Sequence, residues 1–236
     1  MEKHDPSSKL ITAIQPRSPA SEAFRSIRSN LHFATARGQV KSIMFASARA
    51  AEGKSTVVAN VAVAMAQSAK RVLVVDCDLR RPTQHLIFGS RQLPGLTSLL
   101  VDGLDVDEVV LPTKIPNLWL MPSGTIPPNP SELLDSDHMR DLWPILRQNY
   151  DQVLVDSPPV LVVTDAAVLA SQVDGVVMVI EAGETRGELA RDAKESLLHA
   201  GGKVIGAVLN NVKGTGSSGS YYYYYRYYGR QEEKTS

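Results

Sequence analysis

A Gly-Lys-Ser-Thr run at positions 53–56 stands between a short apolar segment and a stretch rich in small residues. Such a loop at the start of a helix presents successive backbone N–H groups to an anion, and the helix N-terminus adds partial positive charge. In a phosphate-binding loop of this kind, the ammonium group of Lys54 reaches the outer phosphates and the hydroxyl of Ser55 binds Mg²⁺. We therefore predict a site for ATP and Mg²⁺. The residues expected to contact the nucleotide are Ala51, Glu52, Gly53, Lys54, Ser55 and Thr56.

The loop departs from the usual pattern in two places. The pattern G-x-x-x-x-G-K-[ST] requires glycine at position 48, where the chain has Ala48. Ala51 also stands where a glycine would ease the backbone. Because an apolar segment precedes the run and a helical pattern follows it, we prefer a phosphate loop to a chance Gly-Lys-Ser at a helix start.

Two further apolar segments end in aspartates. One is followed by Asp76-Cys-Asp78-Leu-Arg80-Arg81, and the other by Asp156. A carboxylate at the end of a buried strand is costly to desolvate unless a metal ion or a hydrogen-bond donor satisfies it. Beside a phosphate loop, the expected partner is Mg²⁺. The alternative for each aspartate is a plain role as a helix cap or turn former.

These side chains suggest roles in phosphoryl transfer. Asp76 and Asp156 are candidate metal ligands, and Asp76 or Asp78 is a candidate general base for a hydroxyl nucleophile. Arg80 or its neighbour Arg81 can stabilise charge on a transferring group. The candidate catalytic residues are therefore Lys54, Asp76, Asp78, Arg80 and Asp156.

Seven of the eight tyrosines lie in one run, YYYYYRYYG, near the C-terminus. They follow residues 214–220, whose Gly/Ser-rich composition is typical of a flexible linker. Neither a helix nor a strand can point all of these phenols into a core, so we expect a substrate or a binding tag. Together with an ATP site, the run suggests a kinase that phosphorylates its own tyrosines. The candidate acceptors are Tyr221, Tyr222, Tyr223, Tyr224, Tyr225, Tyr227 and Tyr228.

The elements that must position these residues follow an alternating pattern. Six short, almost continuous apolar runs predict strands buried on both faces, which is typical of a parallel sheet. The runs are 43–46, 72–75, 118–121, 153–155, 176–180 and 204–209. Helical patterns lie around and between them, at 21–37, 54–69, 107–110, 130–148, 165–170 and 186–200. The alternation predicts an α/β fold with a doubly wound, mostly parallel sheet.

The same pattern suggests three parts of the chain. We predict a polar, loosely ordered N-terminal arm at 1–20, one domain at 21–212 and a flexible linker with the tyrosine cluster at 213–236. Within the domain, Ser21 is the predicted cap of the first helix.

Composition excludes several classes of protein. The chain has 25 Lys+Arg and 25 Asp+Glu, and this balance argues against a general nucleic-acid binder. The single cysteine, Cys77, excludes an internal disulfide framework and is typical of a reducing compartment. The N-terminus has no apolar signal region. No run approaches the roughly 18 apolar residues that span a bilayer. We therefore expect a soluble chain that reaches a membrane only through a partner.

Taken together, the phosphate loop, the runs VLVVDCDLRRP and VLVDSPP, and the tyrosine cluster resemble the bacterial tyrosine kinases. These enzymes are P-loop kinases, unrelated in fold to the eukaryotic type. The resemblance extends from about residue 18 to the C-terminus. It includes an E-x-x-R-x-x-R motif formed by Glu22, Arg25 and Arg28, which spacing puts on one helix face. In the family this motif lies at the subunit interface of a ring, whereas without the resemblance a solvated helix face would be the default interpretation.

The resemblance also implies roles and partners. Asp76 matches the aspartate linked to metal and hydroxyl activation, and Asp156 matches the next metal-linked aspartate. The tyrosine tail would be phosphorylated by a neighbouring subunit of the ring. A transmembrane adaptor of the polysaccharide co-polymerase type would activate the kinase and hold it at the inner face of the cell membrane. A cognate tyrosine phosphatase would reverse the modification, and the process would regulate capsular or extracellular polysaccharide synthesis and export.

Two positions near the loop remain open. Asn210 and Asn211 follow the last strand, where such folds can read the adenine edge, and a turn role is the alternative. Arg49 occupies the place of a signature lysine in the related partitioning ATPases. We favour an exposed loop arginine over a phosphate contact at this position.

Two other functions compete with the kinase. A partitioning or septum-positioning ATPase would have a similar sheet and similar aspartates, but that class usually carries K-G-G-x-G-K-[ST] and has no reason to carry a tyrosine cluster. A nucleotide-gated scaffold without catalysis is the third possibility, because tyrosines also make good binding surfaces. The kinase accounts for more of the features than either alternative.

Overall fold

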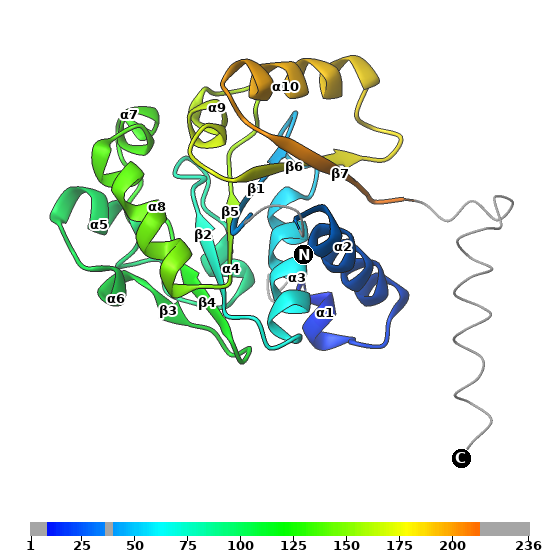
Figure 1. The fold of residues 1–236 in the computed structure, drawn as a ribbon, viewed down its shortest axis with the longest axis horizontal. Helices are drawn as coiled ribbons and strands as arrows, with labels where there is room; N and C mark the ends of the chain where they lie inside the picture. Colours follow the sequence, from blue (N-terminus) through cyan, green and yellow to red (C-terminus); the bar gives the residue numbers. More distant parts are fainter. Residues whose placement is uncertain (1–8, 36–39, 213–236) are drawn as a thin grey trace, which may run out of the picture.

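The computed structural model describes residues 9–35 and 40–212, so the tyrosine cluster lies outside the described residues. In this part of the chain, seven strands form one sheet in the order β3-β4-β2-β5-β1-β6-β7 (Figure 1). Neighbouring strands are parallel except for β3, which is antiparallel to β4. The bounds are β1 Ser42–Ser47, β2 Val72–Asp76, β3 Leu111–Pro112, β4 Leu118–Met121, β5 Gln152–Asp156, β6 Gly175–Glu181 and β7 Val204–Asn210. The predicted fold class is confirmed.

Two helical layers cover the two faces of the sheet (Figure 1). One layer comprises α1 Ile11–Ile14, α2 Pro19–Thr35, α3 Lys54–Ala66 and α4 Gln84–Ile87. The other comprises α5 Leu96–Asp102, α6 Val106–Val109, α7 Pro130–Leu134, α8 Asp137–Asn149, α9 Asp165–Ala170 and α10 Gly187–His199. Along β1, Ile43 and Phe45 pack in the first of these layers, and Met44 and Ala46 pack in the second. This double burial explains why the inner strands are continuously apolar. The edge strand β7 is an exception to the prediction, because its residues are half-buried or exposed.

Two predicted helix boundaries are corrected. The first long helix begins at Pro19, and its N-cap is Ser18, whose Oγ accepts the N–H of Ser21 at 3.2 Å. Ser21 is not the cap, because it lies inside the helix and its hydroxyl donates to the carbonyl of Gln15 at 2.6 Å. The helix predicted at 130–148 is two helices, since Ser136 interrupts it and caps α8 by accepting the N–H of Met139.

Residues 9–20 pack on the domain rather than forming a loose arm. Eleven of the thirteen residues of α3 are buried, so this helix needs cover on all sides. α1 and α2 supply that cover. Inside α3, the Asn60 side chain accepts the N–H of Thr12 at 2.9 Å and donates to the carbonyl of Lys9 at 2.8 Å. This buried amide therefore fastens the N-terminal segment to α3.

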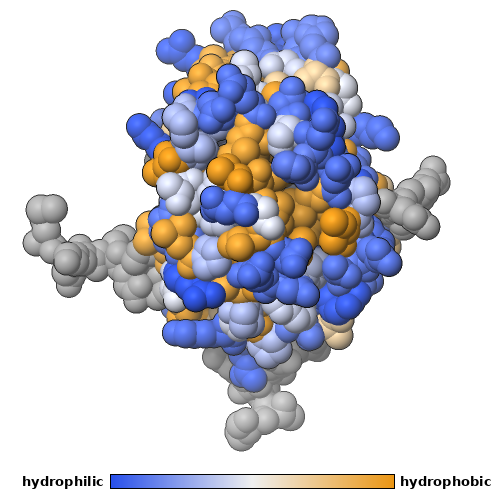
Figure 2. Space-filling view, turned by 90° about the vertical axis from the view of Figure 1, so that its left-hand side faces the viewer, coloured by the Kyte–Doolittle hydropathy of each residue, from blue (hydrophilic) through white to orange (hydrophobic). Residues whose placement is uncertain are grey.

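One side of the molecule presents apolar side chains among polar ones (Figure 2). α5 and α8 lie on this side of the fold, and Val101 and Ile145 on them are exposed. Individual exposed apolar residues are normal on protein surfaces. Within 9–35 and 40–212, no helix is long and apolar enough to cross a membrane.

We predict that Asn60→Ala lowers the free energy of unfolding by about 1–3 kcal/mol, because the N–H of Thr12 then stays buried without an acceptor. Gln67→Ala is the matched control, since exposed Gln67 contacts the same segment through one long bond of 3.4 Å to the Thr12 carbonyl. The control should cost less than about 0.5 kcal/mol. Urea denaturation of both variants checks the prediction, and equal losses would contradict it.

Candidate active site

The phosphate loop connects β1 to α3, and its backbone depends on glycine at one position. Gly53 has φ +81°, and a Cβ there would lie 2.1 Å from Nδ2 of Asn210. Ala51 has φ +68°, a left-handed conformation that an alanine adopts only at a cost. The sequence singles out this alanine because a glycine would fit there better. The loop is therefore held in its shape by contacts outside itself.

Asn210 of β7 supplies one of these contacts. Its Nδ2 donates to the backbone carbonyl of Glu52 at 3.0 Å, and the side chain fills the space beside Gly53. The next residue, Asn211, has φ +55° and donates to a carboxylate oxygen of Glu181 at 2.8 Å. The predicted adenine contact of this pair stays a prediction.

The carboxylate of Glu52 supplies a second contact. The residue is buried, and Oε1 accepts the hydroxyl of Thr185 at 2.6 Å while Oε2 accepts the N–H of Arg49 at 3.2 Å. The guanidinium group of Arg49 donates to the carbonyl of Glu184 at 3.1 Å. Both side chains thus tie the phosphate loop to the connection between β6 and α10. Arg49 has partners within its own chain, as expected of a loop arginine.

Two buried carboxylates face each other at the carboxyl ends of adjacent strands. Asp76 of β2 and Asp156 of β5 are partners in the parallel register, and both are fully buried. Nζ of Lys54 makes a close ion pair with Oδ1 of Asp156 and lies 3.4 Å from Oγ of Ser55. The structure thus brings together four residues that the sequence predicts for one site.

Asp76 is surrounded by backbone donors. Its Oδ2 accepts the N–H groups of Thr83 at 3.0 Å and Gln84 at 2.9 Å, and its Oδ1 accepts that of Asp78 at 3.3 Å. Burial, followed by the nearby charge of Asp156, raises the pKa of Asp76 well above its usual range despite these donors. Without a bound cation, this carboxyl group therefore takes up a proton more readily than an exposed aspartate.

Gln84, which no sequence motif singles out, contacts both aspartates and the phosphate loop. Its Nε2 donates to Oδ2 of Asp156 at 2.7 Å and to the carbonyl of Ser55 at 3.0 Å. The sequence contains only a weak indication of this role, namely that Gln84 lies eight residues after Asp76, a candidate metal ligand.

Asp78 and Arg80 lie on the loop after β2, and the structure gives Arg80 a role that the sequence does not predict. Nε and Nη2 of Arg80 donate to the two carboxylate oxygens of buried Asp165, at 2.8 and 3.1 Å. The hydroxyl of Ser131 also donates to Asp165. Arg80 therefore fastens its loop to α9. Asp78 is partly buried, and this loss of solvent raises the pKa of its carboxyl group. Its Oδ1 accepts the N–H of Arg81 at 3.0 Å.

The site fits a divalent cation bound together with a nucleotide. In the described part of the chain, no three His, Cys, Asp or Glu side chains form a metal-binding group of their own. Mg²⁺ commonly binds through one or two carboxylates, substrate phosphates and water. Ser55, Asp76 and Asp156 provide such a partial set. The buried Oε1 of Gln84 has no hydrogen-bond partner among the described residues, which leaves a polar acceptor beside them.

The predicted interface residues lie on α2, and their side chains have contacts within the chain. Nε of Arg25 donates to Oε2 of Glu22 at 2.6 Å, and Nη2 donates to the carbonyl of Pro16 at 2.8 Å. Arg28 donates to the carbonyl of Ala64 at 3.1 Å, near the end of α3. The predicted interface stays a prediction.

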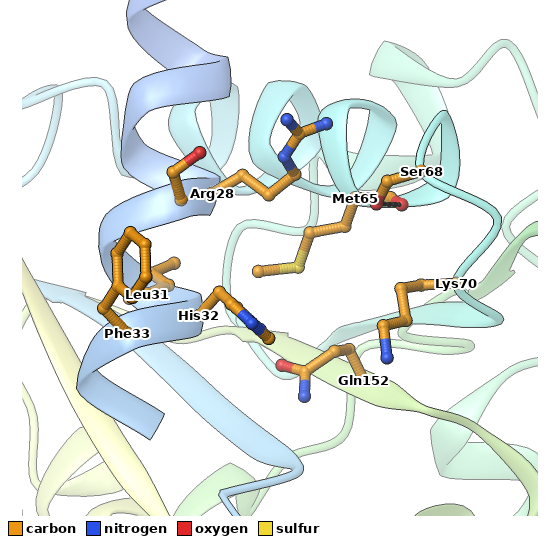
Figure 3. A pocket seen from close by; sticks show the side chains of 9 residues that line it. Arg28, Leu31, His32, Phe33, Met65, Ser68, Lys70 and Gln152 are labelled. Atoms are coloured by element: carbon orange, nitrogen blue, oxygen red, sulfur yellow. Dashed lines mark hydrogen bonds between the residues drawn. The ribbon is translucent and has the colours of Figure 1, made fainter. Parts of the chain in front are cut away.

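A pocket of about 380 Å³ lies beside Arg28, between α2, the end of α3 and the start of β5 (Figure 3). Met65 and Ser68 line it, together with Gln152. Lys54 begins α3 at the phosphate loop, whereas Met65 is near its other end, about 16 Å along the axis. The pocket is therefore separate from the site at the carboxyl edge of the sheet.

Comparisons with known proteins agree with this geometry. A protein-family model described as an AAA domain matches residues 40–187. Tyrosine-protein kinase YwqD of Bacillus subtilis (strain 168) is 43% identical over 204 residues, covering 86% of each chain. The crystal structure of the chimerical protein CapA2B2 has 42% identity and a TM-score of 0.83, covering 87% of this chain and 90% of that one.

A septum site-determining protein, MinD from Pyrococcus horikoshii OT3 complexed with Mg-ADP, is less similar. Its identity is 22% and its TM-score 0.63, over 72% of this chain and 69% of that one. This likeness concerns the fold alone.

We predict that Arg80→Ala lowers the free energy of unfolding by about 1–3 kcal/mol at pH 7, because buried Asp165 loses a half-exposed cationic partner. Burial alone would raise the pKa of Asp165, but hydrogen bonds from Arg80 and Ser131 outweigh it and lower the pKa. A lowered pKa contributes stability above the ordinary pKa of an aspartate, and this contribution is lost as the pH falls through the lowered value.

The difference between wild type and Arg80→Ala should therefore persist down to about pH 4, the ordinary pKa of an aspartate, and shrink as the pH falls further through the lowered pKa of Asp165, because a protonated carboxyl group needs no cation. Arg81→Ala is the control, since that side chain is exposed. Denaturant unfolding between about pH 2 and pH 8 checks the effect, and a difference that stays constant below about pH 4 would contradict it.

Proposed function

The chain belongs to the bacterial tyrosine-protein kinases, and we propose that it transfers the terminal phosphoryl group of ATP to tyrosines 221–228 of its own sequence. The observation that carries this proposal is the cluster of Lys54, Ser55 and Asp156 at the head of α3. In this cluster Lys54 offers a cation for phosphate, Ser55 offers a hydroxyl for a metal ion, and Asp156 offers a buried carboxylate. A fold of this kind binds a nucleotide with a divalent metal, which we take to be Mg²⁺.

Each residue of the site would have its own role in phosphoryl transfer. Bound Mg²⁺ would neutralise charge on the phosphates, with Ser55, Asp76 and Asp156 holding it. Lys54 would bind the outer phosphates, and the backbone of residues 51–56 would cradle them. Asp76 is fully buried, whereas Asp78 is partly exposed, so a tyrosine hydroxyl arriving from solvent can reach Asp78 more easily. A carboxylate in that position can accept the phenolic proton.

We propose further that the kinase acts as a ring in which one subunit phosphorylates the tail of the next. The motif of Glu22, Arg25 and Arg28 supports this, because it stands on one face of α2, where Glu22 is half-exposed. A transmembrane adaptor of the polysaccharide co-polymerase type would activate the enzyme at the inner face of the membrane, and a phosphatase would reset it. The pathway would be capsular or extracellular polysaccharide synthesis and export.

We predict that Lys54→Met lowers tail phosphorylation at least about 100-fold, because the transferring phosphoryl group loses its cation. The control is Lys70→Met, because Lys70 is an exposed lysine just beyond the other end of α3. The tail of this control variant should be phosphorylated normally. Mass spectrometry after incubation with ATP and Mg²⁺ checks both. Replacing the seven tail tyrosines by Phe should remove nearly all phosphate. Normal labelling of Lys54→Met, or phosphate persisting elsewhere in the tail variant, would refute the assignment.

We predict that combined Ala substitutions at Glu22, Arg25 and Arg28 give a monomer in light scattering. Because Arg28 also bonds to the Ala64 carbonyl, a second variant changes only Glu22 and Arg25, and thermal unfolding checks that both remain folded. Arg140→Ala on α8 is the control, since Arg140 makes exposed ion pairs elsewhere in the fold. A ring that survives in both folded variants would argue against the α2 interface.

A further inference from the structure

Gln84 contacts the phosphate loop, Asp76 and Asp156 through its side chain and its backbone. It is fully buried at the first position of α4. Its backbone N–H donates to Oδ2 of Asp76, and its side-chain Nε2 donates to Oδ2 of Asp156 and to the carbonyl of Ser55. A surface glutamine would make none of these contacts.

The orientation of the amide follows from its partners. A carboxylate oxygen and a backbone carbonyl both accept hydrogen bonds, and only the nitrogen of an amide can donate to them. Nε2 must therefore face Asp156 and Ser55, which sends Oε1 in another direction. Oε1 is buried and has no hydrogen-bond partner among the described residues. A buried acceptor without a partner costs about 1–3 kcal/mol, so it calls for an explanation.

A water molecule bound to the metal ion would supply the missing hydrogen-bond donor for Oε1 of Gln84. Mg²⁺ keeps several waters when it binds through few carboxylates and substrate phosphates. Such waters are strong donors, and groups around the ligands orient both ligands and waters. Gln84 donates to Asp156 and to the carbonyl of Ser55, two residues assigned to the metal, and offers a free acceptor beside them.

We propose that Gln84 is a positioning residue for the divalent cation. Its Nε2 holds the Asp156 carboxylate and the Ser55 end of the phosphate loop, and its Oε1 accepts a hydrogen bond from a water of the cation. This inference rests on the proposed function, because it requires a nucleotide and a metal at this site. A purely structural glutamine would instead stabilise the fold without affecting metal affinity.

The test measures metal binding directly, using Mn²⁺ as a spectroscopic probe. Mn²⁺ is titrated into wild type and Gln84→Met in the presence of saturating ADP, and bound metal is followed by electron paramagnetic resonance. Methionine has about the same side-chain volume as glutamine and lacks both polar atoms of the amide. Loss of a residue that orients metal ligands typically costs about 10–100-fold in metal affinity. We expect a loss in this range, with less than about a threefold change in ADP affinity without metal.

The controls separate positioning from folding. Gln92→Met removes a partly buried glutamine that donates to the Gly124 carbonyl outside the site, and it should leave Mn²⁺ affinity unchanged. If Gln84→Met unfolds, Gln84→Asn keeps an amide but shortens its reach, and the same loss is expected. Thermal unfolding without metal identifies the folded variants.

Each outcome decides between the possibilities. Wild-type affinity for Mn²⁺ in a folded Gln84 variant would overturn this inference and leave the proposed function intact. A wild-type protein that binds ADP but no Mn²⁺ would overturn the metal assignment in the proposed function, and this inference with it. A selective loss in the Gln84 variant supports both.

Discussion

Two buried carboxylates, side by side at the ends of β2 and β5, set the constraint around which the rest of the site is built. Asp76 and Asp156 are matched in register, so the sheet itself forces them together. Desolvation and mutual repulsion both disfavour this pair. The compensation comes from three directions: Lys54 at the start of α3, the N–H groups of the turn after β2, and the amide of Gln84. Each of these groups offsets part of the cost of burying the two carboxylates.

The sequence predicts the part of this arrangement that is local. Continuous apolar runs identify six of the strands. An aspartate directly after such a run is predicted to lie at the C-terminal ends of the parallel strands, where ligands bind. The phosphate loop is recognised because its chemistry is contained in consecutive residues. Lys54, Ser55, Asp76 and Asp156 therefore come together as expected. Short windows of sequence place each of these residues at a strand end or a helix start, whereas the strand order that sets Asp76 beside Asp156 comes from the structure.

The hydrogen-bond partners of the site residues lie far away along the chain, and the sequence does not predict them. Arg80 pairs with Asp165, which lies 85 residues away, and Glu52 bonds to Thr185, which lies 133 residues away. Such pairs depend on which loops the strand order brings together. The helices at 96–102 and 84–87 are missed because they are short and follow proline-containing turns. The packing of residues 9–20 depends on Asn60, a polar residue inside an otherwise apolar helix.

The position of β7 couples the end of the domain to its nucleotide loop. Among the described strands, β7 lies at the edge of the sheet and pairs with β6, and the side chain of its last residue, Asn210, fills the space beside Gly53. The predicted tyrosine linker begins only a few residues further along the chain. A shift of β7 would draw the Asn210 amide away from the Glu52 carbonyl. The alignment of this last strand is therefore linked to the geometry of the phosphate loop at the opposite end of the domain sequence.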